Sequence, residues 1–253
     1  MAITDLVPVP GGLNPGVLSA KQATMLALLG NPRTQYSDEC QEVTNPALRP
    51  LFVTDSVGPF RVTGLKPAVI SLRGVLADVA REAPLVHAAL GSAGMFCARL
   101  VRGSQISISN HSWGTAVDVR LNGLLDRRGD GLVQRGLIEI APIFNRQGWF
   151  WGAGFRTEDA MHFEAGDDLV RKWSAEGRFG TPPAAPARLL IMGDRGPEVA
   201  AVQKRLNAHG AQLTVDGIFG LGTRGAVASF QAASGLPPDG VVGPSTLKAL
   251  ELE

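Results

Sequence analysis

The sequence predicts an α+β fold, with a small antiparallel sheet and flanking helices, followed by a small three-helix domain at the C-terminal end. Two observations predict the sheet: residues 115–121 alternate apolar and polar side chains, and residues 161–164 do the same if they are extended. Apolar residues at helical spacing, as in 67–79, predict the helices that flank it. Together these patterns favour a mixed fold over a helical bundle.

The composition is that of an ordinary globular chain with room for one large and one small domain. The chain has 253 residues, of which 45% are hydrophobic and 19% are charged. A stretch rich in Pro and Ala begins at Thr181 and is typical of a semi-rigid linker. We therefore expect domains at 1–180 and 189–253, joined by a linker at 181–188.

Local signals predict the order of elements in the larger domain. Gly and Pro mark the ends of segments, and apolar residues three or four apart mark helices. The expected elements are an extended arm at 1–16, a helix capped by Ser19 at 21–29, irregular structure at 31–58, a strand at 60–64, helices at 67–83 and 85–90, strands at 95–102 and 105–109, a tight turn at 125–131, a helix at 137–147 that contains Pro142, an aromatic core strand at 149–155 and a helix at 168–176.

The two segments predicted to lie in the sheet carry an unusual set of polar residues. His111 precedes Asp118 by seven positions, and His162 follows Asp159 by three. The alternation directs Val117 toward the core and Asp118 toward the opposite face. The polar faces of the two segments could therefore line one cleft.

These residue types fit a catalytic zinc site with a base beside it. A catalytic zinc ion takes three N or O ligands from the protein and leaves a position for water, whose pKa the ion lowers toward neutrality. His111, Asp118 and His162 would supply the three ligands. A peptide-bond hydrolase also needs a general base near that water. Asp159 is the better placed candidate for the base, with Glu158 as the alternative.

The same residues resemble the motifs of a known family. Ser-x-His-x-x-Gly-x-Ala-x-Asp is matched at 109–118, and an acidic residue three positions before a His-Phe pair is matched at 159–163. These motifs are similar to those of the VanY-like zinc D,D-carboxypeptidases and L-alanyl-D-glutamate endopeptidases, which include many phage endolysins. The resemblance implies zinc on His111, Asp118 and His162, and hydrolysis of peptide bonds in peptidoglycan.

Four further side chains near the first motif are candidate contacts to a substrate. In the resembling family, an Arg before the metal-ligand His helps to hold the substrate carbonyl or carboxylate. Arg99 and Arg102 both stand in that region, and of the two we favour Arg102 as a catalytic residue. Ser109, which opens the motif, and Trp113, inside its loop, are the candidate substrate-binding residues.

The residues after the expected linker contain an internal repeat. The pattern Asp-Gly-x-x-Gly-x-x-Thr-x-x-Ala begins at Asp216 and again at Asp239. Each copy predicts a turn that leads into a helix, with Thr223 or Thr246 helping to cap it. Residues 189–250 resemble the peptidoglycan-binding domain of cell-wall hydrolases, which implies that this region binds the wall polymer.

Charge and hydropathy argue against other classes of partner. The formal net charge of +1 argues against nucleic acid, and no stretch is apolar enough to span a membrane. The N-terminus lacks an export signal, so we expect synthesis in the cytosol and, as for an endolysin, release to the wall. We expect a monomer. Cys40 and Cys97 are too few for a disulfide scaffold, so two reduced thiols are expected, with a single bridge as the alternative.

The combined expectation is a two-domain peptidoglycan hydrolase of the endolysin type. Zinc-activated water would cut the stem peptide, and the endolysin-like build favours the bond between L-Ala and D-Glu. One alternative is a D-alanyl-D-alanine carboxypeptidase. The other, from a different class, is a non-catalytic wall-binding structural protein of a phage, and the intact set of zinc-ligand and base residues argues against it.

Overall fold

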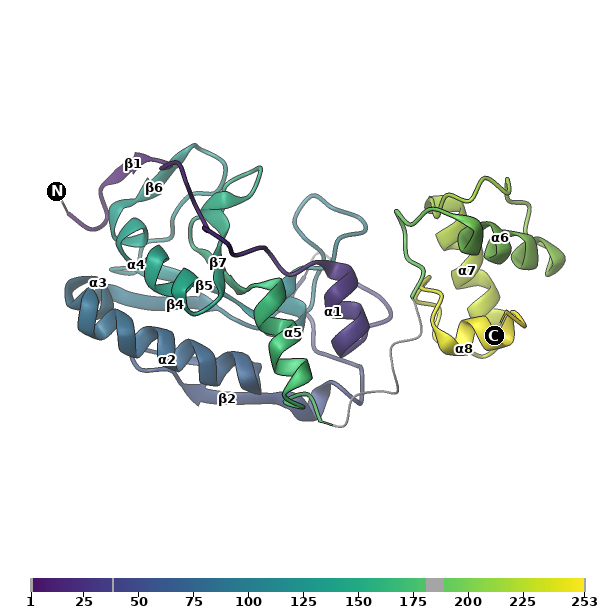
Figure 1. Ribbon diagram of the computed structural model, residues 1–253, viewed down its shortest axis with the longest axis horizontal. Helices are drawn as coiled ribbons and strands as arrows, with labels where there is room; N and C mark the ends of the chain where they lie inside the picture. Colours follow the sequence, from purple (N-terminus) through teal and green to yellow (C-terminus); the bar gives the residue numbers. More distant parts are fainter. Residues whose placement is uncertain (1, 38, 181–188, 253) are drawn as a thin grey trace.

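The computed structural model of the protein describes residues 2–37, 39–180 and 189–252 (Figure 1). Buried apolar side chains gather in two separate cores, a larger one between Ala20 and Trp173 and a smaller one between Leu190 and Leu250. The fold class predicted from the sequence is confirmed: an α+β unit with small antiparallel sheets precedes a small helical unit. The linker expected at 181–188 lies outside the described residues.

A four-stranded antiparallel sheet forms the centre of the larger unit, in the order β4-β5-β8-β7. In this sheet β5 pairs with β8 so that Asp118 lies opposite His162. The two motifs found in the sequence are therefore neighbours in space, although 44 residues separate these two side chains along the chain. The strands are β4 (Leu90–Gly94), β5 (Ala116–Leu121), β7 (Trp149–Trp151) and β8 (His162–Ala165).

The central strand β5 has one apolar and one polar face, as its alternation predicts. Val117 and Val119 are buried, whereas Asp118 and Arg120 are partly exposed. Three helices pack against one another, and their buried side chains lie in the same hydrophobic core as Val117 and Val119. These helices therefore cover the apolar face of β5 and leave its polar face open. These helices are α2 (Lys66–Glu82), α3 (Pro84–Ala89) and α4 (Arg135–Arg146), the last with Pro142 inside it.

The remaining elements of the larger unit surround this centre. Helix α1 packs against α5 and also contacts η2, the short helix that carries the first motif. Two separate ribbons, β1 with β6 and β2 with β3, lie outside the main sheet. The bounds are β1 (Leu6–Pro8), α1 (Gln22–Leu29), η1 (Arg49–Leu51), β2 (Phe52–Ser56), β3 (Arg61–Leu65), η2 (Asn110–Trp113), β6 (Leu132–Gln134), η3 (Gly152–Gly154) and α5 (Asp167–Ala175).

The secondary structure predicted for two stretches of this unit was wrong. The strands expected at 95–102 and 105–109 do not form, and the segments meet at a single bridge between Leu100 and Ile108. The hydroxyl of Ser104 accepts the backbone N–H groups of Ile106 and Ser107, both in the second expected strand, and these bonds compete with a regular ladder. Strand β2 forms where irregular structure is expected, because β3 supplies a partner for its whole length.

Cys40 and Cys97 form a disulfide, which is the alternative to the two reduced thiols expected from the composition. Their neighbours Gln41 and Ala98 exchange two backbone hydrogen bonds beside the bridge. The bridge therefore ties the irregular segment before β2 to the segment that leads into η2. No helix among the described residues is long and apolar enough to cross a membrane.

In the smaller unit, each copy of the sequence repeat folds around one buried Gln from the preceding helix. The unit has the three predicted helices among its described residues: α6 (Pro197–Ala208), α7 (Leu221–Ala233) and α8 (Pro244–Ala249). Gln203 of α6 donates to Asp216, to the Ile218 carbonyl and to Thr223, and accepts the N–H of Gly217. Gln231 of α7 makes the same four bonds with Asp239, Val241, Thr246 and Gly240.

These bonds explain why the repeat contains Asp, Gly and Thr. The prediction that Thr223 and Thr246 help to cap the helices is wrong. The N-cap positions of α7 and α8 are Gly220 and Gly243, without side-chain caps. Thr223 and Thr246 lie inside the first turn, where each hydroxyl accepts from a Gln amide and lies within bonding distance of a preceding carbonyl. Their role is thus to satisfy a buried amide rather than to begin a helix.

The turn between β5 and β6 carries a buried acid. Asp126 is 3% exposed; its Oδ2 accepts the N–H of Gln134 at 2.6 Å, and its Oδ1 has no partner among the described residues. Burial raises the pKa of Asp126 to about 6. Close by, Glu158 accepts the N–H groups of Asp130 and Gly131, which closes the predicted tight turn.

We expect Asp126→Asn to remove one component of the pH dependence of stability. The folded-state pKa lies above the value of about 3.9 in an unfolded chain, so between about pH 4 and pH 6 only the folded state holds this proton. The free energy of unfolding of the wild type should therefore fall as the pH rises through this window, by about 1 to 2 kcal/mol more than that of the variant. Urea unfolding on both sides of the window measures the difference, and an identical pH dependence would contradict it.

Candidate metal centre

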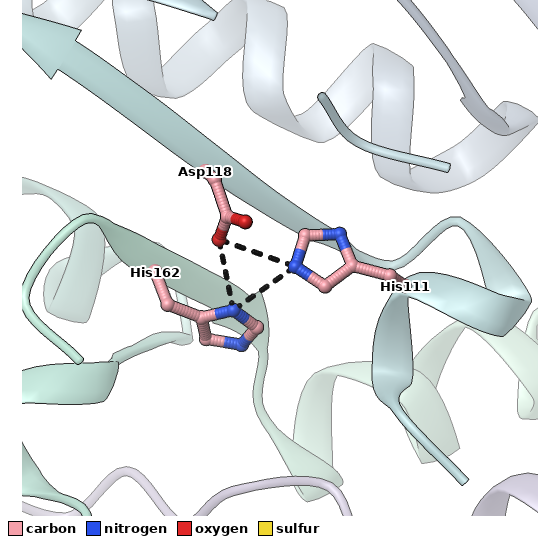
Figure 2. Close-up of side chains that lie close together, drawn as sticks. All are labelled: His111, Asp118 and His162. Carbon is pink, nitrogen blue, oxygen red and sulfur yellow. Dashed lines mark hydrogen bonds and ion pairs between the residues drawn. The ribbon is translucent and has the colours of Figure 1, made fainter. Parts of the chain in front are cut away.

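The polar ends of His111, Asp118 and His162 meet on the open face of the sheet (Figure 2). His111 comes from η2, Asp118 from β5 and His162 from the first position of β8. His111 Nε2 lies 3.2 Å from Asp118 Oδ1 and 3.1 Å from His162 Nδ1. His162 Nδ1 lies 3.1 Å from the same Asp118 oxygen. The three atoms thus form a nearly equilateral triangle.

This spacing fits the ligand set of a zinc ion. Ligands held about 2.0 to 2.1 Å from a tetrahedral zinc ion lie about 3.3 Å from one another. The observed separations of 3.1 and 3.2 Å are close to that value. Two imidazoles and one carboxylate are also a donor set that suits zinc. The three residues can therefore hold a divalent metal ion.

The ring of His111 is fixed from behind by a backbone carbonyl. Its Nδ1 lies 3.0 Å from the carbonyl oxygen of Met95, so Nδ1–H donates there and the unprotonated Nε2 faces the triangle. Gly114 ends η2 with a φ of 63°, and a Cβ at this position would lie 2.7 Å from the backbone nitrogen of Leu65. The motif therefore needs Gly here, because η2 passes directly against the end of β3.

The ring of His162 is fixed from behind by a buried carboxylate that the sequence analysis does not single out. His162 Nε2 lies 2.9 Å from Glu164 Oε2, which leaves Nδ1 to face the triangle. Glu164 is 2% exposed, and its Oε1 accepts the hydroxyl of Ser19 at 2.6 Å. Ser19 is thus not the predicted cap of α1, whose N-cap is Lys21. The His-x-Glu spacing on one strand face is the signal that points to Glu164.

Charges at the triangle stabilise one another. Burial lowers the pKa of His162, but its hydrogen bonds to Asp118 and Glu164 outweigh burial and raise that pKa to about 10. Burial opposes ionisation of Asp118, but His111 and His162 hold the pKa of its carboxyl well below the usual range. A metal ion at the triangle would take the place of the proton on His162.

Of the two adjacent acids, only Asp159 faces the cleft that contains the triangle. Its Oδ1 is buried and has no partner among the described residues, and its Oδ2 lies 3.6 Å from Nε of Arg128. Burial raises the pKa of Asp159. The carboxylate of Glu158 is held in the turn at 129–131 instead. The backbone at Asp159 passes so close to residue 152 that Gly is needed there, because a Cβ would lie 2.5 Å from the carbonyl oxygen of Asp159.

The cleft has a volume of roughly 790 Å³, and Ser109, Arg99 and Arg102 line it. Burial lowers the pKa of Arg99, whose guanidinium also interacts with the charges of Asp118 and Asp159. Arg102 is more exposed. The charge interactions therefore make Arg99 the stronger of the two candidates for contact with a reacting group, whereas the sequence favours Arg102.

The predicted substrate contact by Trp113 is wrong. Its side chain is fully buried, and its indole N–H donates to the carbonyl of Gly30 at 2.8 Å. The turn of η2 that aims His111 at the sheet directs Trp113 into the core, where it has no surface left for a ligand. Of the aromatic core strand expected at 149–155, only β7 at 149–151 forms, and it is buried at every position, whereas residues 152–154 form η3.

Comparison with known proteins finds a matching family model in each unit. Residues 102–165 match the family model of D-alanyl-D-alanine carboxypeptidases, and residues 195–250 match the model of a putative peptidoglycan-binding domain. The first match contains both motifs of the candidate metal centre, and the second contains the repeat. These matches confirm the resemblance of the chain to the zinc carboxypeptidase family and to wall-binding domains.

Individual relatives match over short parts of the chain. The chain is 43% identical over 64 residues to the zinc D-Ala-D-Ala carboxypeptidase of Streptomyces albus G, which covers 24% of this chain and 25% of the relative. It is 46% identical over 56 residues to the N-acetylmuramoyl-L-alanine amidase CwlM of Mycobacterium tuberculosis, covering 22% and 14%. The crystal structure of a Burkholderia AP3 phage endolysin matches with 48% identity, 24% coverage of each chain and a TM-score of 0.24. The chain thus spans a quarter or less of these proteins.

We expect Glu164→Gln to weaken zinc binding by about 10- to 100-fold, because the neutral amide holds the His162 ring less firmly and makes it a weaker donor. Competition against a chromophoric chelator measures the affinity, and circular dichroism reports whether the fold is kept. Glu158→Gln is the matched control, since that carboxylate bonds only to the turn at 129–131 among the contacts described. An affinity equal to that of the wild type would show that Glu164 does not support the metal.

Proposed function

We propose that this protein is a zinc-dependent peptidoglycan hydrolase that cuts the stem peptide of the wall. The observation that carries the proposal is the meeting of His111, Asp118 and His162 in a cleft, with separations that suit one zinc ion. The match of residues 102–165 to the D-alanyl-D-alanine carboxypeptidase family supports the same reaction class. In this proposal the three residues are the metal ligands.

The side chains around the triangle have distinct roles in the proposed reaction. Zinc, when bound, supplies polarisation of the scissile carbonyl and a nucleophilic water near neutral pH. Asp159 takes the proton of that water and returns it to the leaving amine, and its partnerless Oδ1 favours this role. Burial raises the pKa of Asp159, which makes it a stronger base. Arg99 or Arg102 stabilises the charge on the carbonyl oxygen, and Ser109 contacts the substrate.

We favour the bond between L-Ala and D-Glu as the scissile bond. The volume of the cleft lies in the upper part of the roughly 300 to 1,000 Å³ usual for small-ligand sites. Such a space suits a peptide that extends on both sides of the scissile bond. The D-alanyl-D-alanine bond is the second candidate, favoured by the description of the matching family and of the Streptomyces relative.

We also propose that the chain divides into a peptidase domain at 1–180, a linker at 181–188 and a peptidoglycan-binding domain at 189–253. The match of residues 195–250 and the separate core of the smaller unit support this division. A domain that holds the wall would raise the local concentration of the peptidase at an insoluble polymer without contacting the scissile bond.

Mass spectrometry of the soluble products from purified peptidoglycan tests the proposal. Zinc-loaded protein should release peptides with a new D-Glu amino terminus, and protein stripped of metal by a chelator should not. Release of free D-Ala alone would move the assignment to the carboxypeptidase. The absence of any metal-dependent product would favour a non-catalytic wall-binding protein.

We expect Asp159→Asn to lower kcat by about 10²- to 10⁴-fold, because the amide cannot accept the proton of the attacking water. Its zinc affinity should stay close to that of the wild type, since Asp159 is not part of the ligand triangle. Glu158→Gln should keep its activity, because that side chain is held outside the cleft lining. Product release from labelled walls measures the rates. A fully active Asp159→Asn would eliminate this residue as the base.

A further inference from the structure

We propose that Arg120 binds the carboxylate of the substrate residue that supplies the leaving amine. The proposal rests on the function proposed above and adds a specificity-determining residue to it. Arg120 lies two residues after Asp118 on β5, so both side chains leave the same face of the sheet, about 7 Å apart along the strand. A group bound by Arg120 is therefore next to the candidate metal centre.

Arg120 has no partner of its own in the described part of the chain. Its Nε is buried and makes no hydrogen bond there. Across the ladder on β4 it faces Gly91, which has no side chain to offer. On the other side, β8 begins at His162, opposite Asp118, so the ladder ends before it reaches Arg120. Because a buried N–H without an acceptor costs free energy, this position suits an acceptor brought by a ligand.

The charges in the cleft favour an anionic acceptor. Two of its three carboxylates, Asp118 and Glu164, are hydrogen-bonded to imidazoles, and the third, Asp159, lies beside Arg128. The cationic side chains outnumber these carboxylates two to one and leave positive charge without a counterpart. They are Lys21, Arg99, Arg102, Arg120, Arg128 and Arg156.

Arg120 is the best placed of these cations to recognise a group close to the scissile bond. Arg102 and Arg156 are exposed at the edge of the cleft. Arg99 donates to a backbone carbonyl, and Arg128 pairs with Asp159. Among the described arginines of the cleft, Arg120 combines a buried, unbonded N–H with a position on the strand of the metal ligands.

The chemistry of the substrate supplies the matching anion. In the L-Ala to D-Glu linkage, the leaving nitrogen is bonded to the carbon that carries the α-carboxyl group of D-Glu. In the D-alanyl-D-alanine bond, the leaving nitrogen is bonded to the carbon that carries the terminal carboxyl group. A guanidinium forms two parallel N–H···O bonds with a carboxylate, and a carboxamide cannot accept both. Arg120 therefore selects a free carboxylate over an amide at this position.

The test uses two pairs of synthetic stem peptides. In each pair, one carboxyl group is free in one member and amidated in the other. This group is the α-carboxyl group of D-Glu in the first pair and the terminal carboxyl group in the second. Zinc-loaded wild type, Arg120→Gln and Arg127→Gln are compared. Arg127 is exposed outside the cleft lining, so its variant makes the same charge change away from the site. Cleavage is followed by chromatography, and binding by calorimetry in an Asp159→Asn background.

We expect a preference for the free acid in one of the two pairs. In that pair, wild type and Arg127→Gln should prefer the free acid by about 10-fold or more in both affinity and kcat/KM. Arg120→Gln should prefer it by less than about 3-fold. The lost preference should come from weaker binding of the acid, with binding of the amide nearly unchanged. No preference of the wild type in either pair, or an equal loss for acid and amide in Arg120→Gln, would overturn the assignment. Absence of cleavage together with an Arg120-dependent preference for the acid would refute the proposed hydrolase and support the carboxylate site.

Discussion

The structure depends on holding three ligand atoms, two imidazole nitrogens and one carboxylate oxygen, 3.1 to 3.2 Å apart on a largely buried surface. Lone pairs directed at one point repel one another unless a proton or a metal ion lies between them. Each imidazole ring must therefore be held by a bond on its far side. The Met95 carbonyl does this for His111, and the Glu164 carboxylate does it for His162. The surroundings thus prepare the lone pairs for a cation before one binds.

This requirement explains why distant parts of the chain converge on the polar face of the sheet. Ser19 bonds to Glu164 across 145 residues of sequence. Its neighbour Ala20 accepts the side-chain amide of Asn110, and the N–H of Lys21 donates to Asp167. The segment before α1 is therefore bonded both to the loop that carries His111 and to the elements around β8. A change in this N-terminal segment would reach the candidate metal centre through these bonds, although the segment supplies no ligand.

The sequence predicts the ligand triangle better than it predicts what supports it. Alternation in β5 and β8 assigns Asp118 and His162 to polar faces, because a strand has a fixed period of two. The partners behind them depend on tertiary contacts that no local pattern contains, so the role of Ser19 was missed and Trp113 was misassigned to the cleft. The repeat of the smaller unit predicts its helices in the same way. That each copy closes around Gln203 or Gln231 becomes visible only in the structure.

The zinc content of the purified protein tests whether His111, Asp118 and His162 bind a metal ion. Wild type and Asp118→Ala are loaded with zinc, dialysed, and measured by inductively coupled plasma mass spectrometry, with circular dichroism to verify that both are folded. We expect about one zinc ion per chain for the wild type and almost none for the variant, which lacks one corner of the triangle. A folded wild type that binds no zinc, or a variant that keeps its full zinc content, would contradict this expectation.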